Sequence, residues 1–386
     1  MEESRKSRKR QKELARKRAL RRRQVRRQKM ILGGSAGALF LLVLLAAVVS
    51  GRGGDRDVKP EEEKKEEIQE SAEEKEPEIV TLTISAAGDC TLGTDEFFYY
   101  PTSLPAKYEE KGDPGYFLQK VEPVFSKDDL TIVNMEGTLT RETDRQDKTY
   151  AFKGDEEYVQ ILTEGSVEAA NLANNHSHDY GEKSYTDTIE TLEDAGISTF
   201  GYDRTAVMEI KGVKIGLLGT YELGEHMGCE EEMIKNIESL KDEGAQIIIA
   251  SFHWGIEREE HPEEYQRTMG KQYIDAGADL VVGSHPHVLQ GIEYYQGKPI
   301  VYSLGNFVFG SSIPRTALLK VELEEADSVK LSLIPATSGA GYTRALTEAG
   351  EQEEFYSYMT GISYEVNVDG EGRVWPAAGD QKDGSE

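Results

Sequence analysis

The stretch DLVVGSHPH, residues 279–287, joins two features that decide how this chain folds. Residues 279–282 are largely apolar and β-branched, which predicts a buried strand. His285 and His287 follow directly, two residues apart in extended backbone after Gly283. A single histidine after a strand is usually a structural residue, but a His-x-His pair there favours metal ligation. The stretch therefore predicts a strand that delivers two imidazoles to the edge of a sheet.

The same arrangement of an apolar strand followed by polar residues recurs along the chain. Strands are predicted at 80–87, 130–133, 166–172, 213–220, 245–252, 279–282 and 299–303. Helices are predicted at 115–127, 183–195, 231–243 and 262–276, the last with Pro262 at its start. Further on we expect paired strands at 316–321 and 329–335, a loop at 338–348, a helix at 351–360 and a hairpin within 366–374. Alternating strands and helices predict an α/β fold.

Six of these strands end at Asp, Glu, Asn or His. The polar ends lie at 88–89, 134–136, 174–176, 253–255, 283–287 and 305–306. In open α/β sheets, ligands bind outside the carboxyl ends of the strands. We therefore expect these polar side chains to converge on one edge of the molecule.

The candidate ligands combine carboxylate and amide oxygens with imidazole nitrogens. They are Asp89, Glu136, Asn175, His253, His285 and His287. Such a mixed set suits one or two divalent ions of Mn, Fe, Zn or Mg rather than a thiolate site. Capping of turns is the alternative role for Asp89 and Glu136, but it does not explain the whole set.

Charge is distributed unevenly over the 386 residues, whose formal net charge is -26. Residues 1–30 contain fifteen Lys or Arg and three Glu, whereas the rest of the chain is strongly acidic. An acidic body repels phosphates, so we expect no nucleic-acid partner. The two cysteines, Cys90 and Cys229, cannot build a disulfide framework, and we expect free thiols.

The basic segment predicts a membrane topology. Residues 31–50 include a long run without charge that matches the hydrocarbon core, so we expect a transmembrane helix that contacts lipid. The positive-inside rule places residues 1–30 in the cytoplasm and the C-terminal body outside the cell. A cleaved signal peptide is the alternative. Residues 51–78 read as a charged linker, 79–375 as the folded domain and 376–386 as a disordered tail.

Five motifs in this order resemble the CapA family of bacterial capsule or poly-γ-glutamate synthesis proteins. They are GDCTLG at 88–93, NMEGTLT at 134–140, NLANNHSHDYG at 171–181, HWGIE at 253–257 and GSHPHVLQGIEYYQGKPIVYSLGNFVF at 283–309. The resemblance covers roughly residues 79–335. It implies a calcineurin-like metallophosphoesterase fold, which is a two-layer β-sandwich flanked by helices. The partners it implies are other membrane subunits of a capsule synthase and an anionic cell-envelope polymer or its precursor.

The resemblance also implies a role for each candidate residue. Asp89 would bind a first metal, Glu136 would bridge, Asn175 and His253 would bind a second metal, and His285 and His287 would close the site. His176 would be the acid that protonates the leaving oxygen. Apart from the resemblance, Asp179 follows His176 closely and would orient that imidazole, as carboxylates orient catalytic histidines, or else cap the following helix. Asn306, Trp254 and Glu257 are weaker candidates, whose alternative roles are a turn, core packing and an exposed surface position.

One position departs from the wider superfamily. Its first motif is Asp-x-His, whereas this chain has Thr91 where the histidine would stand. Cys90 could substitute as a ligand, but alternation along a strand points it away from Asp89. The missing imidazole leaves three functions open: a metal-dependent hydrolase or transferase, a non-catalytic assembly or export subunit, and a domain that only binds a ligand or partner.

Overall fold

The computed structural model describes residues 81–323 and 329–377. All described residues belong to one compact unit, Lys75–Glu386. The predicted arm, transmembrane helix and linker therefore lie outside the described residues, as does nearly all of the predicted tail. Among the residues that are described, no helix is long and apolar enough to cross a membrane.

Two large sheets form the centre of the domain. The first has ten strands in the order β17-β18-β15-β14-β1-β2-β5-β6, with β13 beside β1 and β16 beside β15. Its strands are β1 (Leu82–Cys90), β2 (Leu130–Met135), β5 (Ala169–Asn171), β6 (Ser198–Phe200), β13 (Asn306–Val308), β14 (Ile313–Leu323), β15 (Val329–Gly339), β16 (Tyr342–Ala345), β17 (Val366–Val368) and β18 (Arg373–Pro376). Strands β1, β2, β5 and β6 run parallel, so their carboxyl ends share one edge.

The second sheet has six strands in the order β11-β12-β10-β9-β8-β7. They are β7 (Ala206–Ile210), β8 (Val213–Tyr221), β9 (Ile247–His253), β10 (Leu280–Ser284), β11 (Leu289–Tyr295) and β12 (Lys298–Leu304). Its four central strands are parallel, and both edge strands are antiparallel to their neighbours. A separate pair, β3 (Thr138–Leu139) and β4 (Lys153–Gly154), lies in the chain between β2 and β5.

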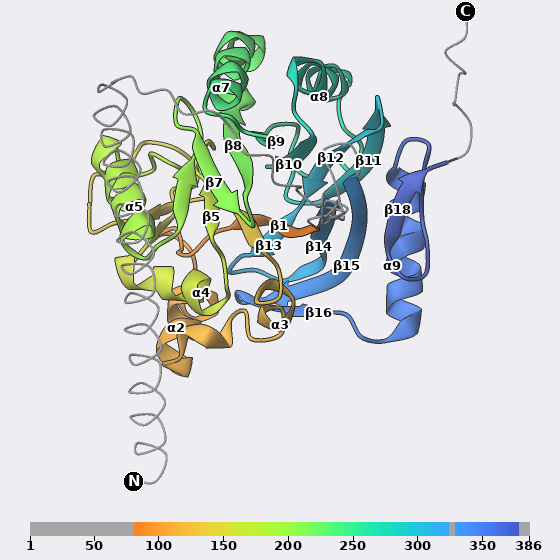
Figure 1. Cartoon of the computed structure of the whole chain (residues 1–386). Helices are drawn as coiled ribbons and strands as arrows, with labels where there is room; N and C mark the ends of the chain where they lie inside the picture. Colours follow the sequence, from red (N-terminus) through yellow and green to blue (C-terminus); the bar gives the residue numbers. More distant parts are fainter. Residues whose placement is uncertain (1–80, 324–328, 378–386) are drawn as a thin grey trace, which may run out of the picture. The chain divides into compact units, whose positions relative to one another are not determined.

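Helices cover the outer faces of both sheets, except that the last of the described helices packs on the core between the sheets. The α-helices are α2 (Leu104–Lys111), α3 (Glu122–Phe125), α4 (Val159–Glu164), α5 (Glu182–Asp194), α6 (Glu222–Glu225), α7 (Glu230–Asp242), α8 (Glu264–Ala276) and α9 (Ala349–Ile362). Short 3₁₀ turns are η1 (Tyr100–Thr102), η2 (Pro114–Tyr116), η3 (Glu156–Tyr158) and η4 (His226–Cys229). Figure 1 shows α7 and α8 together at the top, α2 and α4 at the lower left, and α9 beside β18 at the right.

The period of two along each strand separates an inner core from two outer ones. Between the sheets, Ile84 of β1 and Ile132 of β2 pack in one cluster with Ile249 of β9 and Val282 of β10. The opposite face of the ten-stranded sheet packs on α2–α5, and that of the six-stranded sheet packs on α7 and α8. The predicted α/β sandwich flanked by helices is confirmed.

Two sequence predictions are wrong in their detail. No continuous helix occupies 115–127: η2 and the four-residue α3 take its place, because Pro123 lacks the N–H that a continuing helix needs. Phe117, Val121 and Phe125 of this segment are nevertheless buried. The predicted loop 338–348 contains β16, which extends the sheet by pairing with β15.

The predicted helix 262–276 is shorter at its start. Helix α8 begins at Glu264, and Glu263 and Gln266 form a capping box before it, so Pro262 lies outside the helix. Strands β6, β7, β11 and β13 were not predicted.

Candidate metal centre

The inward-facing positions change from apolar to polar at the carboxyl ends of the parallel strands. On β1 and β2, Asp89 and Asn134 are in register and follow inner-core residues such as Ile84 and Ile132. On β9, His253 is the last residue and lies on the same face as Ile249, which packs in the inner core. The polar edge predicted from the sequence is therefore the end of the inter-sheet core.

Asp89 is held in place by a close backbone approach. Its N–H donates to the carbonyl of Gly305 at 2.9 Å. A Cβ atom on the preceding Gly88 would lie only 1.8 Å from the same carbonyl oxygen, so only glycine fits there. The GDC and LGN segments thus form one structural unit, with Asn306 paired to Asp89 across β13 and β1.

Glu136 lies at the centre of the polar cluster. Its side chain is fully buried, and neither carboxylate oxygen has a hydrogen-bond partner among the described residues. The Nε2 atoms of His176, His253 and His287 each lie 3.9 Å from its Oε1. Three imidazole nitrogens from three separate segments thus surround one carboxylate oxygen, and each is too far from it for a hydrogen bond.

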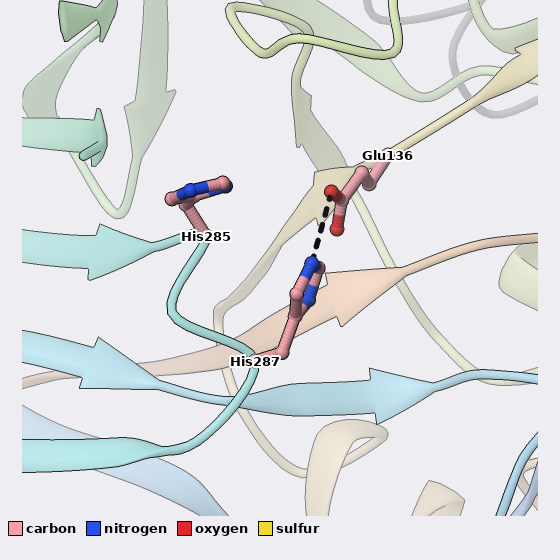
Figure 2. A group of neighbouring side chains, drawn as sticks. All are labelled: Glu136, His285 and His287. Atoms are coloured by element: carbon pink, nitrogen blue, oxygen red, sulfur yellow. Dashed lines mark ion pairs between the residues drawn. The ribbon is translucent and has the colours of Figure 1, made fainter. Parts of the chain in front are cut away.

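The His-x-His segment does not have the extended backbone that the sequence predicted. His285 and His287 have φ values of 97° and 60°, a region that residues other than glycine rarely adopt. Strain of this kind persists where the surrounding structure enforces it, often at functional sites. Figure 2 shows both side chains at the end of the β10 segment, with the dashed line joining His287 to Glu136.

The second nitrogen of His287 fixes the orientation of its ring. Nδ1 lies 2.8 Å from Oδ1 of Asn306 and 3.4 Å from Oδ2 of Asp89. An Nδ1–H donated to these oxygens leaves the lone pair on Nε2, which faces Glu136. For His285, the Nδ1 atom is buried and has no hydrogen-bond partner among the described residues. Glu136, His285 and His287 offer ligand atoms within 4.8 Å of one another.

His253 and Asn175 approach the same place from two other segments. The Nε2 of His253 lies 2.8 Å from Oδ1 of Asn175. Its Nδ1 lies 3.4 Å from both Oγ of Ser284 and Nδ2 of Asn134. The Nδ2 of Asn134 also donates to Asp89 at 2.8 Å, so Asn134 connects the two sheets beneath the cluster.

His176 has a carboxylate on one side and the cluster on the other. Its Nδ1 lies 2.7 Å from Oδ2 of Asp179, while its Nε2 faces Glu136. The Nζ of Lys148 donates to Oδ1 of Asp179 at 2.7 Å and to the carbonyl of Asn175 at 2.6 Å. Asp179 thus orients the imidazole, which is one of the two roles expected for it, and Lys148 holds Asp179.

The pKa shifts of the buried groups in the cluster favour the binding of a cation. Burial, and then the nearby Asp89, raise the pKa of Glu136 well above its ordinary value. Burial lowers the pKa of His285 to about 4 and holds that of His253 well below its ordinary value. Burial also opposes a charge on His287, but Glu136 and Asp89 outweigh it and raise the pKa to about 10. Without a metal, the cluster therefore retains protons that a divalent ion would replace.

The residues present fit a divalent ion. A buried carboxylate without a hydrogen bond is costly unless a cation compensates it. Oxygen and imidazole donors of this kind bind Mn, Fe or Zn. All six candidate ligands and His176 belong to this cluster. Trp254 instead packs in the outer core and donates to the carbonyl of Tyr302, and Glu257 is exposed.

One contributor was not predicted from the sequence. Lys148 lies in the loop between β3 and β4, and no local pattern indicates its contact with Asp179. Asn134 and Asn174 belong to the polar strand ends that were expected to converge, but no role was predicted for either of them. Asn174 donates to the carbonyl of Met135 and caps the His176 turn. Cys90 and Cys229 are free thiols, as expected. Both are buried, and Cys90 packs in an outer core.

The fold and site together define a class: an α/β sandwich with a candidate metal centre at the carboxyl ends of strands from both sheets. Residues 83–311 match the family described as bacterial capsule synthesis protein PGA_cap, and the chain belongs to that family. It is 28% identical over 318 residues to the capsule biosynthesis protein CapA of Bacillus anthracis, covering 75% of each chain. It is 31% identical over 251 residues to the PGA biosynthesis protein CapA of Bacillus subtilis, covering 59% of this chain and 66% of that one.

Solved structures give weaker similarities. A hypothetical protein from Thermus thermophilus is 14% identical with a TM-score of 0.41, covering 67% of this chain and all of the other. A score of this size supports no inference about activity.

Proposed function

We infer that this chain is a membrane-anchored, extracytoplasmic protein of capsule or poly-γ-glutamate synthesis with a metal-dependent, phosphoesterase-like site. One observation carries the inference about the site: the buried Glu136 carboxylate has no hydrogen bond among the described residues and lies 3.9 Å from three imidazole nitrogens. The family and the two CapA relatives support the role in capsule synthesis.

The side chains of the cluster suggest which residues would bind the metal. Asp89, Glu136, Asn175, His253, His285 and His287 would hold one or two ions. A metal held there would supply Lewis acidity and lower the pKa of a water, so that hydroxide is available near neutral pH. His287 would be kept in the ligating tautomer by Asn306, which accepts from its Nδ1 at 2.8 Å.

His176 would handle the proton of the leaving oxygen. Its Nδ1 is engaged by Asp179, so an added proton is carried on Nε2, the atom that faces the cluster. Asp179 stabilises the resulting imidazolium and orients the ring. Lys148 holds Asp179 in place.

The test is hydrolysis of bis(p-nitrophenyl) phosphate by the full-length chain, with and without added manganese. We expect metal-dependent turnover that is lost in His176→Ala while the bound metal is retained. Phosphoesters left intact at every metal concentration would contradict the catalytic role.

A non-catalytic assembly subunit is the second candidate. The observation that favours it is Thr91, which stands where the superfamily has a metal-binding histidine, so one ion would have a weaker ligand set. In that case His176→Ala would leave polymer export unchanged while the folded protein persists.

The proposed topology rests on residues 1–50 of the sequence. The basic arm, apolar run and acidic body support a cytoplasmic N-terminus and an outer domain. Other membrane subunits of a capsule synthase are the proposed partners. Protease digestion of intact protoplasts tests the topology, because the domain should be cleaved from the anchor while the arm stays protected.

A further inference from the structure

A cavity of about 650 Å³ lies beside the candidate metal centre. Thr91, two residues after Asp89, is one of its lining residues. Phe152 and Phe309 also line it. Between ring centroids, Phe152 lies 4.5 Å from His176, and Phe309 lies 6.0 Å from His287. The cavity therefore shares a wall with the side chains that surround Glu136.

Aromatic rings continue from that wall to the surface. Phe98 lies 6.1 Å from Phe152 and 5.6 Å from Tyr150, between ring centroids. Phe97 and Tyr99 line the outer part and are 75% and 73% exposed. Among the described residues, five of the eight exposed large hydrophobic side chains belong to this region, so their exposure is concentrated there rather than scattered.

One exposed ring is held in place. The guanidinium of Arg145 lies 4.7 Å from the centroid of Phe97, and Arg145 is itself fixed by Asp95 at 2.8 Å. A ring that is both exposed and fixed is pre-organised for stacking on a ligand, because little side-chain entropy is lost on binding.

The polar lining consists of hydroxyl groups rather than carboxylates. Thr91, Thr94, Thr102, Ser103, Ser311 and Ser312 line the cavity, and no Asp or Glu of the described residues does. Lys107 is the charged residue of the lining, and Glu110 already pairs with it. In a chain with 71 acidic residues, a lining without carboxylates is a marked local departure.

Thr91 supplies a second, independent sign of a ligand. Its side chain is 2% exposed, and its Oγ1 is buried without a hydrogen-bond partner among the described residues. A buried hydroxyl without a partner costs free energy, and a hydroxylated ligand in the cavity would supply that partner. An acyl chain would leave the hydroxyl unpaired. A polyglutamate would bring carboxylates to a cavity whose cation is already paired.

We propose that this cavity binds the sugar portion of a phosphorylated carbohydrate whose phosphoester lies at the metal centre. Planar rings stack on the apolar faces of a sugar, while side-chain hydroxyls bond its hydroxyl groups. The phosphoester part of this assignment rests on the proposed function, whereas the sugar part rests on the cavity alone. Thr91 then serves the substrate at the position where the superfamily has a metal ligand.

Isothermal titration of the full-length chain in lipid nanodiscs with maltotriose tests the sugar part. Maltotriose has no phosphate, so its binding should persist when metal is chelated. Replacing Phe97 and Tyr99 together by Ala should weaken binding about tenfold, since two stacking surfaces are lost. Thr91→Val, which replaces the hydroxyl by a methyl group of similar size, should weaken it about fivefold. Trp375→Ala is the matched control, because Trp375 is exposed on β18 and does not line the cavity.

The outcomes separate the two proposals. Sugar binding without any metal-dependent phosphoester turnover would retain the cavity assignment and overturn the catalytic one. Turnover without sugar binding, or sugar binding unchanged in the Phe97 and Tyr99 variant, would overturn the cavity assignment. Tighter binding of dodecyl phosphate or of a poly-γ-glutamate oligomer than of maltotriose, lost in the same variant, would also overturn it in favour of that ligand.

Discussion

The Nε2 atom of His287 lies 3.9 Å from Oε1 of Glu136, with no hydrogen bond joining them. Ligands of this kind bind a transition metal at about 2.0–2.2 Å, so two of them on one ion are commonly separated by about 3–4 Å. The spacing therefore suits a shared ion better than a direct contact.

The first prediction concerns Glu136→Gln. Burial raises the pKa of Glu136, so folding without a metal must either bury its charge or take up a proton. The neutral amide avoids this cost, and we expect the metal-free melting temperature of the variant to rise by about 2–4 °C. The stabilisation by manganese expected for the original chain should disappear. Differential scanning calorimetry with EDTA or manganese measures both effects. Glu353→Gln, on an exposed position of α9, is the control, and a Glu136→Gln variant that manganese still stabilises would contradict the assignment.

The second prediction concerns Lys148→Met. The pKa of His176 is lowered mainly by burial, Asp179 opposes this, and Lys148 adds to the lowering. Removing the ammonium also releases Asp179 to act fully on the imidazole, so both effects raise the pKa of His176. An NMR titration of the metal-free protein measures the shift. An unchanged or lower pKa would show that Lys148 does not act through Asp179.

The third prediction concerns stability in acid. Burial opposes ionisation of Glu293, but hydrogen bonds from Arg267, Lys271 and Tyr302 outweigh it and lower its pKa from 4.5 to about 2. A carboxyl with a depressed pKa stabilises the fold above pH 4.5, and this contribution is lost as the pH falls towards 2. With solvent screening of the partly exposed partners allowed for, the contribution is about 2 kcal/mol.

Urea unfolding between pH 2 and 6 measures that contribution. Glu293→Gln should be less stable than the original chain near neutral pH and should lose less stability in acid. Glu322→Gln, at an exposed position of β14, should leave the profile unchanged. Parallel profiles for the Glu293 variant and the original chain would rule out the linkage.

The fourth prediction concerns Gly88→Ala. The added Cβ would lie 1.8 Å from the carbonyl oxygen of Gly305, and neither backbone can move without displacing Asp89. We expect a loss of about 3 kcal/mol in the free energy of unfolding, together with weaker metal binding. Gly361→Ala in α9 is the control, because a Cβ there meets nothing within 4 Å and alanine favours the helix. A stable Gly88→Ala variant with full metal binding would contradict the close approach.

The strand-end pattern predicted most of the site because it depends on short-range sequence. Each short apolar run predicts a strand, and the polar residue that follows it predicts the end of that strand. Asp89, Glu136, His253 and the His285–His287 pair all follow such runs. Lys148 was not predictable, because it reaches Asp179 from a loop 31 residues away in sequence. The β11 strand, Leu289–Tyr295, was missed because its polar and small residues interrupt the apolar pattern. Its place at the sheet edge is set by pairing with β12.

The exposure of the aromatic residues 97–100 could not be predicted from the sequence either. Phe97 to Tyr100 would read as core from hydropathy alone, yet all four are exposed. Phe98 packs against Phe152, which is distant in sequence and contacts Phe309 in the cavity wall.

Elemental analysis of the full-length chain purified with manganese, combined with anomalous diffraction from its crystals, tests the central claim most directly. We predict one or two ions per chain, ligated by Glu136 and His287 and lost in Glu136→Gln. Crystals with no anomalous peak at this cluster, and no metal in solution, would contradict the claim that these residues form a metal centre.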